Sequence, residues 1–341
     1  MAALSAALPT QLDLAKMLDP DGKTLAQIIP ILQQDNEILP RLGWMEANGG
    51  TVHRNTYHTS YPTPTWTGFN DEVAPTKGTT GQSVDGLGLM QAYSHVDEFL
   101  ARSSGDVEGF RMRQDAMTIQ GFSNEFNSTL FYGNADLVPE EFTGLSARYA
   151  YAGTNANITE TAENIIHGGG TANNVHTSIW IVTPNGNMGG VAGIYQRGTQ
   201  AGIKMSNLSL QMVAGATAGK FAQKFTTHFS WSCGITVPDW RKNVRIPNIV
   251  VSTLTKNAGS GADIIDLVMQ GRSRLPMGTS GSIILANRTI MDFLDRQARN
   301  SVVNSTLSYD TVGGKPILQL AGMPVLRCDA LLNTEAPVPV T

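Results

Sequence analysis

Residues 106–132 read DVEGFRMRQDAMTIQGFSNEFNSTLFY, and this stretch carries the strongest helix pattern in the chain. Its apolar residues recur at spacings of three and four, which predicts one helix with a single buried stripe. The stripe consists of Met112, Ala116, Ile119, Phe122, Phe126 and Leu130. Asp106 is placed to cap the start, and Gly133-Asn134 to end the helix. At about 1.5 Å per residue the helix is roughly 40 Å long, which is unusual for a globular domain.

The region before this helix changes character at about residue 51. Residues 1–50 predict a helical arm, with short helices at 10–18 and 24–35. Residues 51–94 are rich in Thr, Gly, Pro and aromatic residues. Pro62, Pro64 and Pro75 exclude a central strand, so an edge ribbon or extended loop is expected. So long a ribbon is uncommon within one compact monomer, and reaching over a partner would explain it.

The region after the helix mixes strands and helices without a strict βαβ order, which indicates the α+β class. The pattern predicts strands at 178–183, 282–286, 316–320 and 324–327, helices at 262–270 and 288–299, and a long hairpin at 203–212 and 225–237. The second arm of the hairpin alternates. Phe225, Phe229, Trp231, Cys233, Ile235 and Val237 would face a core, and Thr226, His228, Ser230, Ser232 and Thr236 a more polar side.

Composition narrows the possible functions. The 341 residues are 41% hydrophobic and only 15% charged, which suits a surface covered by other subunits and equally a neutral enzyme with a large core. A net charge of −4 without a basic run argues against a dedicated nucleic-acid binder. The apolar runs are too short to span a membrane, and the N-terminus lacks a secretory signal. Cys233 and Cys328 are isolated, which fits a reducing compartment.

The sequence offers no complete catalytic, cofactor or metal motif. His167-Gly168-Gly169-Gly170 resembles a lipase oxyanion loop, but the chain has no Gly-x-Ser-x-Gly nucleophile elbow, so a Gly-rich loop before a strand is expected. Residues 215–220, GATAGK, are one residue short of a phosphate-binding loop and predict a hairpin turn. His53, His58 and His95 lack metal-ligand spacing, and Glu140-Glu141 would point to opposite faces of a strand. We therefore expect no enzyme and no cofactor.

Several short motifs, taken together, resemble one family. They are Trp44-Met45-Glu46 with Asn48-Gly49-Gly50-Thr51, Pro75-Thr76-Lys77, Ala92 to Asp97, Leu130 to Asn134, Pro139 to Leu145, Trp180, Tyr195, Gly198, Asp239-Trp240 through Asn248, Gly322 to Val325, and Asp329 to Glu335. From about residue 40 to the end, the chain resembles the tailed-bacteriophage major capsid proteins, which have the Hong Kong 97-type fold. Each motif is weak alone, and their combination is specific.

The resemblance implies a domain plan. It makes 1–50 an N-terminal helical arm, 51–94 the extended loop called the E-loop, and 95–150 a peripheral domain with the spine helix at 106–132. An axial domain would occupy 151–315, and 316–341 would form closing strands that return to the peripheral domain.

The resemblance also implies a function. Hexamers and pentamers of the subunit would build an icosahedral shell around double-stranded DNA, contacted without sequence specificity. The expected location is the virion, with the host cytoplasm during assembly. The chain reaches the arm early, so a scaffolding protein is expected to be separate, beside a portal and a cement protein. A nanocompartment shell subunit of the same fold, or a hydrolase, are the alternatives.

Four residues of the extended loop are candidates for contacts between subunits: Tyr61, Trp66, Phe69 and Lys77. Aromatic side chains commonly dominate such contacts. Some relatives crosslink subunits through an E-loop Lys and a partner Asn. Lys77 is the only Lys of this loop, but nothing near it predicts reactivity, so we expect it to be a surface residue.

Overall fold

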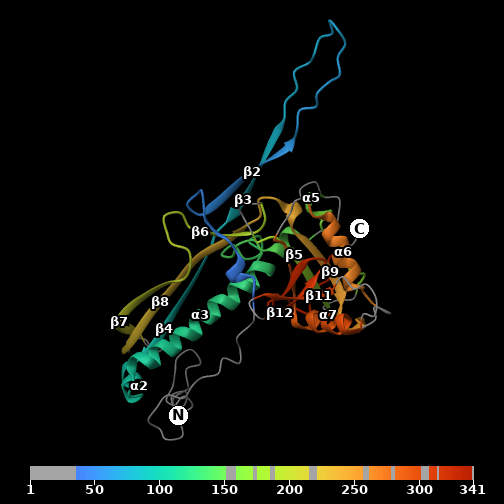
Figure 1. The fold of residues 1–341 in the computed structure, drawn as a ribbon. Coiled ribbons are helices and arrows are strands. Elements are labelled where there is room, and N and C mark those ends of the chain that lie inside the picture. The colour runs from blue at the N-terminus through green and yellow to red at the C-terminus, as the bar shows by residue number, and fades with distance from the viewer. Residues whose placement is uncertain are drawn as a thin grey trace. The chain divides into compact units, whose positions relative to one another are not determined.

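The computed structural model describes residues 36–150, 159–171, 175–184, 189–214, 221–255, 261–277, 281–300, 307–312 and 315–339. The two helices predicted at 10–18 and 24–35 lie outside these residues. The described chain forms two compact units (Figure 1). The first contains residues 89–128 and 202–232, and the second contains 35–88, 129–201 and 233–341. The hairpin predicted near 203–237 thus groups largely with the long helix, and not with the rest of 151–315.

The long helix predicted from the sequence is α3, Val107–Tyr132. Asp106 begins it as predicted, because its Oδ1 accepts the Gly109 N–H at 2.9 Å. The helix stops at Gly133, whose N–H donates to the Thr129 carbonyl at 2.9 Å. A Cβ atom on Gly133 would lie 2.5 Å from the Phe142 carbonyl oxygen. Only glycine permits this close approach, so the predicted stop is confirmed.

The C-terminal half of the predicted α3 stripe is buried, but its N-terminal half is not. In the first unit, Phe122 and Phe126 pack against β8 (Phe221–Thr236), where Phe126 stacks on Trp231 with ring centroids 4.8 Å apart. Met112 and Ile119, by contrast, are 72% and 42% exposed, and Ala116 is exposed. Here the prediction of one buried stripe is wrong.

The side chains that face the sheet in this part of α3 are polar. The Arg111 guanidinium lies 5.0 Å from the ring centroid of Phe225, and Asp115 accepts a hydrogen bond from the Thr227 hydroxyl. Apolar spacing alone could not reveal this, because a charged side chain can cover an aromatic ring as well as an apolar one can.

The first unit is completed by β4 (Gly88–Asp97), α2 (Glu98–Ser103) and β7 (Lys204–Ala214), with β8 between β4 and β7. The predicted hairpin is confirmed, because β7 pairs antiparallel with β8 from Lys204↔Ser230 to Ala214↔Phe221. The turn between them, 215–220, lies outside the described residues. Val96, Leu100, Ala101 and Phe110 form a small core.

The predicted alternation along β8 holds in its middle and is wrong near both ends. Phe229 and Trp231 are buried, whereas His228 and Ser230 are half-buried. Thr226 and Thr236 are buried although they belong to the polar set. Each has a hydrogen-bond partner, respectively His95 and Asp85, and a satisfied hydroxyl group can be buried at little cost.

The second unit is built on a six-stranded sheet in the order β11-β12-β13-β10-β5-β9, in which only the β10–β13 pair is parallel. The strands are β5 (His176–Val182), β9 (Val244–Val250), β10 (Ile283–Ala286), β11 (Leu307–Val312), β12 (Lys315–Leu320) and β13 (Met323–Arg327). Helices α6 (Ile264–Arg274) and α7 (Arg288–Asn300) pack on them around an aliphatic core (Figure 1). The α+β class and each predicted element of this region are confirmed.

Short elements complete the second unit. They are η1 (Leu39–Arg41), β1 (Trp44–Glu46), β2 (Val52–Ser60), β3 (Thr79–Gly86), α4 (Leu145–Arg148), α5 (Thr159–Ala162), β6 (Ala192–Tyr195), η3 (Trp240–Lys242) and η4 (Val251–Thr253). Strand β1 pairs parallel with β6, and β6 pairs antiparallel with the end of β8. The described end of the segment predicted as a helical arm, 36–50, contains η1 and the strand β1, in which Trp44 packs on Gly193.

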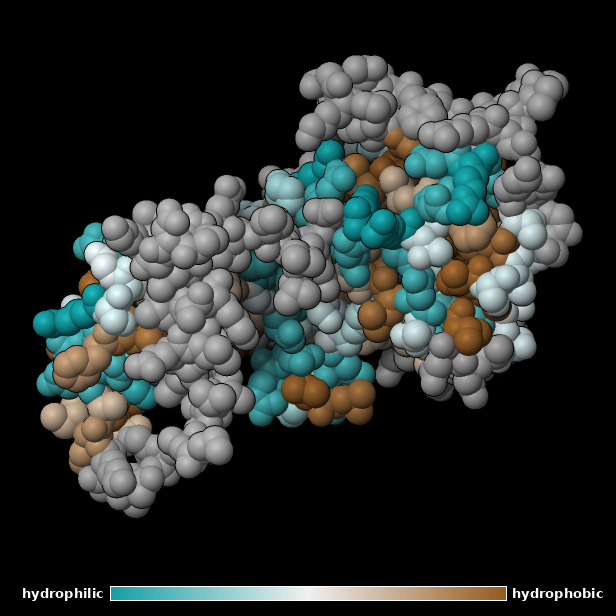
Figure 2. Space-filling view, turned by 90° about the horizontal axis from the view of Figure 1, so that it is seen from below, coloured by the Kyte–Doolittle hydropathy of each residue, from teal (hydrophilic) through white to brown (hydrophobic). Residues whose placement is uncertain are grey.

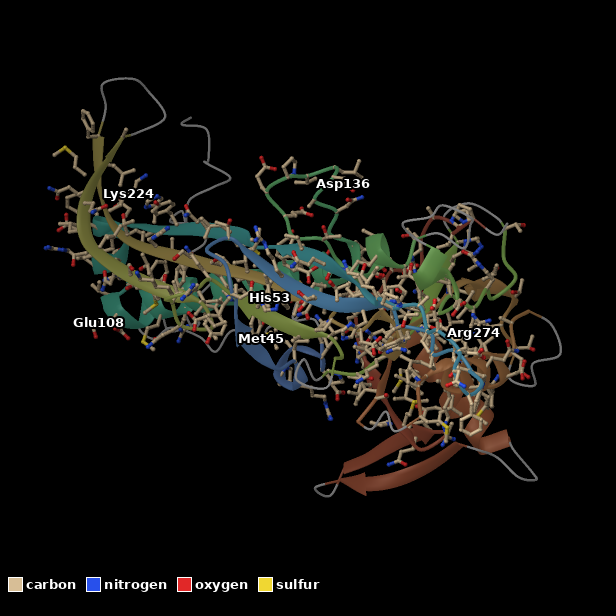
Figure 3. The ribbon with its side chains drawn as sticks, turned by 90° about the horizontal axis from the view of Figure 1, so that it is seen from above. Met45, His53, Glu108, Asp136, Lys224 and Arg274 are labelled. Carbon is tan, nitrogen blue, oxygen red and sulfur yellow. The ribbon has the colours of Figure 1, made fainter. Side chains whose placement is uncertain are left out.

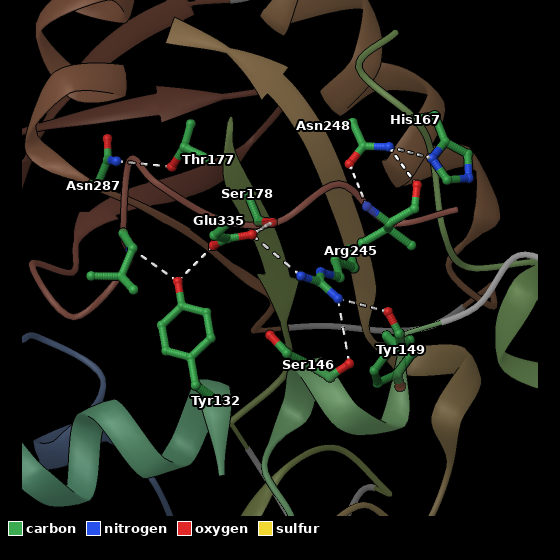
Figure 4. A network of polar contacts seen from close by, with 12 residues as sticks. Tyr132, Ser146, Tyr149, His167, Thr177, Ser178, Arg245, Asn248, Asn287 and Glu335 are labelled. Atoms are coloured by element: carbon green, nitrogen blue, oxygen red, sulfur yellow. Dashed lines mark hydrogen bonds and ion pairs between the residues drawn. The ribbon is translucent and has the colours of Figure 1, made fainter. Parts of the chain in front are cut away.

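A buried network of polar groups ties the C-terminal segment to this unit (Figure 4). The Glu335 carboxylate lies 3.3 Å from Arg245 Nη2, accepts the Tyr132 hydroxyl at 2.6 Å, and accepts the Ser178 hydroxyl. Arg245 also donates to the Tyr149 carbonyl at 2.9 Å. Burial and the Glu335 carboxylate raise the pKa of Tyr132 well above its usual range. The phenol therefore stays protonated and remains a donor to Glu335.

The surface carries scattered hydrophobic residues. On the face drawn in Figure 2, they lie in patches among hydrophilic residues. None of the described helices combines the length and the apolar character that crossing a membrane requires.

We expect Phe122→Asp to destabilise the first unit by several kcal/mol, because it places a charge in a packed aromatic core. Met112→Asp, on the exposed part of the same helix, should change stability by less than about 0.5 kcal/mol. Denaturant unfolding of both variants tests this. Equal losses would mean that α3 buries the face that contains Met112.

We expect Glu335→Gln to lower the free energy of unfolding by about 3 kcal/mol, because Arg245 is then left buried without its counter-charge. Asp292→Asn is the matched control, since it removes the carboxylate of the exposed Asp292–Arg296 pair and should cost less than about 0.5 kcal/mol. Chemical denaturation with tryptophan fluorescence measures both changes. A wild-type midpoint for Glu335→Gln would contradict the stabilising role of the pair.

Candidate assembly surface

The most exposed part of the second unit is the hairpin formed by β2 and β3. These strands pair antiparallel from Val52↔Gly86 to Ser60↔Thr79, and residues 61–78 connect them. In Figure 1 this connection is an open loop beyond the ends of the two strands. The ribbon predicted for 51–94 is confirmed over 52–86, whereas 88–94 belong to β4, which pairs with β8. Its three prolines lie in the connection, where no ladder hydrogen bonds are needed.

All four candidate contact residues lie on this loop, and all are exposed. Tyr61 is 78% exposed, and Trp66 and Phe69 are 101% and 103% exposed. Tyr61 has the His58 ring beside it, at a centroid distance of 5.6 Å. Within the described part of the chain, Trp66, Phe69 and Lys77 take part in no hydrogen bond, ion pair or ring contact. The structure therefore places these residues together but supplies no partner for them.

Local interactions give the loop tip a defined turn. The Asp71 Oδ2 atom accepts the Gly68 N–H at 2.8 Å, and Asn70 between them has a φ of 68°. Asn and Gly tolerate such turns better than other residues do. The turn presents Phe69 outward without support from any packed core.

The base of the hairpin, in contrast, is fastened by a buried ion pair. Asp85 of β3 is 2% exposed, and its Oδ1 lies 2.6 Å from Arg148 Nη1 of α4. The other carboxylate oxygen accepts the Thr236 hydroxyl at 2.6 Å and the Asn55 side-chain N–H at 3.1 Å. Asn55 belongs to β2, so both strands of the hairpin share the anchor.

A hydrogen-bond chain extends this anchor along β2. The Asn55 Oδ1 atom lies 3.1 Å from Nε2 of His53, which Figure 3 labels on β2. The other His53 ring nitrogen accepts the Asn48 N–H at 3.3 Å. The histidine that the sequence left without a role is thus part of the hairpin base.

Sequence reasoning missed Asp85, Arg148, Asn55 and Thr236. Asp85 and Arg148 are 63 residues apart, and Asn55 and Thr236 are 181 apart. No periodicity or short motif links positions at such separations. The one available signal was an acidic residue at a strand position of the ribbon, because a carboxylate that becomes buried requires a partner.

A groove of about 720 Å³ lies beside the hairpin base. One wall comes from residues 57–59, Tyr61 and Ser83 of the hairpin, and the remaining lining comes from residues 147–149, Thr161 and 237–241. Its cationic side chains are already paired, Arg148 with Asp85 and Arg241 with Asp239. The groove therefore has no strong charge preference for a ligand.

A second exposed apolar surface lies on the N-terminal half of α3 in the first unit. It comprises Met112, Met117 and Ile119, with Ala116 between them. In the second unit, the turn after α3, where Figure 3 labels Asp136, exposes Leu137. Exposed apolar clusters of this kind commonly mark interaction surfaces.

Several other residues that the sequence motifs singled out are hydrogen-bonded or buried within the fold. Gly168 and Gly170 donate their N–H groups to carbonyls of β9, as expected for a Gly-rich loop before β5. His95 bonds Thr226, and burial followed by the nearby Lys224 lowers its pKa. The described residues contain no group of three His, Cys, Asp or Glu side chains placed to hold a metal ion. Burial raises the pKa of each of Cys233 and Cys328 to about 12.

Comparison with known proteins places this surface in context. The family model "Major capsid protein GP7" matches residues 19–339. In the solved structure of bacteriophage Epsilon15, one chain is 30% identical, with a TM-score of 0.76 and coverage of 99% of both chains. No curated protein sequence matches.

Other solved structures are more distant. The bacteriophage JBD30 capsid is 8% identical, with a TM-score of 0.48 and coverage of 96% of both chains. The SrpI encapsulin of Synechococcus elongatus is 13% identical, with a TM-score of 0.38 and coverage of 70% of this chain and 97% of that chain.

The family match covers nearly the whole chain, and the Epsilon15 likeness extends over all of both folds. The Hong Kong 97-type fold and the capsid function implied by the sequence motifs are thereby confirmed, and the phage capsid is preferred to the nanocompartment and hydrolase alternatives. The chain belongs to the major capsid protein GP7 family, the shell-forming subunits of bacteriophage heads.

Proposed function

We propose that copies of this subunit close into hexamers and pentamers, and that these build an icosahedral head shell around double-stranded phage DNA. The observation that carries the proposal is the loop at 61–78, which exposes Tyr61, Trp66 and Phe69. Trp66 and Phe69 have no partner within the described part of the chain. Such a loop is a liability for a monomer, because exposed aromatics invite non-specific association. In a shell, every copy of the loop has a neighbour to cover it.

The loop would serve as the E-loop, with Tyr61, Trp66 and Phe69 as aromatic anchors and Lys77 at its rim. Its proposed partner surface is the exposed half of α3 in the adjacent subunit, with Met112, Met117 and Ile119. Both surfaces are apolar and neither is covered within the described part of its own subunit. Flexible methionine side chains adapt well to aromatic rings, which favours this pairing.

The domain plan follows from the same assignment. Residues 1–50 would form the N-terminal arm, 51–94 the E-loop and 95–150 the peripheral domain with α3 as its spine helix. The axial domain would lie within 151–315, and 316–341 would return to the peripheral domain. Because residues 202–232 group with α3, we count this hairpin with the peripheral domain.

We infer a purely structural role, without catalysis or cofactor. A separate scaffolding protein, a portal and a cement protein are the proposed partners besides the subunit itself. The host cytoplasm is the proposed place of assembly. Contact with packaged DNA would be non-specific, which fits a net charge of −4 without a basic cluster in the sequence.

We expect the purified protein, alone or with its scaffold, to sediment as capsomers or closed shells. In a ring capsomer each subunit contacts its two neighbours through two different faces, and rotational symmetry closes the ring. Analytical ultracentrifugation and negative-stain microscopy test this. A stable monomer at high concentration in both conditions would contradict the proposal.

We expect Trp66→Ala to leave the circular dichroism and melting temperature of the unassembled subunit unchanged, and to weaken the shell. The loss should be about 2 kcal/mol for each contact, as for a buried aromatic anchor at an interface. Shell yield, and the denaturant concentration at which shells dissociate, are the measurements.

Thr67→Ala in the same exposed loop is the control and should assemble as the wild type does. If Trp66→Ala instead melts the isolated subunit while the surviving fraction assembles normally, Trp66 belongs to the core of its own subunit.

A further inference from the structure

We infer that the buried Asp85–Arg148 pair, with Asn55 and Thr236, is a positioning device that sets the direction of the β2–β3 hairpin for assembly. The inference rests on the proposed function of the loop as the link between subunits. It assigns a role in assembly to residues that are buried and that need not touch a neighbouring subunit.

Along the hairpin from its base toward the loop, Asp85 is the last buried residue. Asp85 is buried and Asn55 is half-buried, whereas every described residue from Thr56 to Gln82 is exposed, apart from the half-buried Gly78 and Gly81. Beyond this rung, Tyr57, His58 and Tyr61 line the groove beside the hairpin, but the strands bury no further side chain. The direction of the whole exposed segment is therefore fixed where Asp85 and Asn55 meet the rest of the second unit.

Three polar contacts join this rung to two elements outside the hairpin, α4 and β8. Arg148 of α4 contacts one carboxylate oxygen of Asp85, and Thr236, at the end of β8, donates to the other. The Asn55 side chain donates to Asp85 and to Thr236, at 3.1 and 2.6 Å. Because Arg148 and Thr236 hold the rung from different elements, the hairpin base cannot rotate without breaking one of these contacts. This arrangement restrains orientation as well as adding stability.

Arg148 is itself held in place, so the anchor has a firm base. Its guanidinium donates to the Thr143 carbonyl at 3.3 Å from two nitrogens, and to the Ile235 carbonyl at 3.5 Å. Close backbone packing adds to this. A Cβ atom on Gly234 would lie 2.8 Å from the Gly86 carbonyl oxygen, so β8 passes directly against the end of β3.

Because the loop extends far from the anchor, a small rotation at the hairpin base displaces the aromatic tip by a large distance. Trp66 lies 11 residues beyond Asn55, which at about 3.3 Å per residue is a reach of up to roughly 36 Å. A rotation of about 10° at the anchor then moves the aromatic tip by about 6 Å, which exceeds the width of an aromatic contact. An interface built on Trp66 and Phe69 therefore depends on the angle held at Asp85.

The test measures orientation directly in the full-length chain. Nitroxide labels are placed at the exposed positions of Thr67→Cys in the loop and Ser273→Cys in α6, both in the second unit. The native Cys233 and Cys328 are buried and do not compete for the label. Electron spin resonance gives the distance distribution between the labels before assembly, and sedimentation gives the shell yield.

Asp85→Asn should broaden the distribution by about 6 Å and lower shell yield several-fold. Glu335→Gln is the matched control, because it also turns a buried, Arg-paired carboxylate of the second unit into an amide. It should lower stability without broadening the distribution. Asn55→Ala removes the β2 contact without leaving a buried charge, so it should broaden the distribution less than Asp85→Asn does. This variant also tests the inference if Asp85→Asn does not fold.

An unchanged distribution in Asn55→Ala and in folded Asp85→Asn overturns the inference, as does equal broadening in Glu335→Gln. Trp66→Ala separates the two possible failures. Normal shells from both Trp66→Ala and Asp85→Asn overturn the proposed function of the loop together with this inference. Poor shells from Trp66→Ala with unchanged label distances in Asp85→Asn overturn the positioning role alone.

Discussion

The exposure of residues 61–78 follows from the chemistry of proline. Pro62, Pro64 and Pro75 cannot donate ladder hydrogen bonds, so the segment that holds them cannot become a central strand of its own subunit. Its aromatic residues consequently remain in solvent. On the proposed role of this loop, neighbouring subunits would cover the exposed aromatic residues and the apolar face left open on α3, and the anchored hairpin base would direct the loop toward them.

Two buried ion pairs hold segments of the second unit that lie far apart in the sequence. Arg245–Glu335 fastens the C-terminal segment to β9, and Asp85–Arg148 fastens the hairpin to α4. Each carboxylate also accepts hydrogen bonds from uncharged side chains, which lowers the cost of burying it. Apolar packing in the same places would tolerate sliding, whereas directional bonds to several donors fix one arrangement. A lattice of identical subunits needs such uniformity.

The sequence predicts most of the elements and little of the site. The length of α3, its cap at Asp106 and its stop at Gly133 follow from local rules, and so do β5, β10, β12, β13 and both helices of the sheet in the second unit. Strands β9 and β11 were not predicted. The buried face of α3 near Met112 could not be predicted, because Arg111 covers Phe225 in place of an apolar residue. The strand at Trp44–Glu46 was missed because its pairing with β6 is a long-range contact. Tyr61, Trp66, Phe69 and Lys77 could be placed on an exposed loop from proline content alone, but Asp85 and its partners meet only after folding.

Cys233 and Cys328 have a consequence for the particle outside the cell. They are the only two thiols of the chain, both lie in the interior, and burial raises the pKa of each to about 12. Nearly all of both side chains therefore stays in the unreactive thiol form at neutral pH. In an oxidising environment, neighbouring subunits of the shell therefore present no exposed thiol to one another and cannot be joined by a disulfide. The cohesion of the shell then owes nothing to redox chemistry at cysteine.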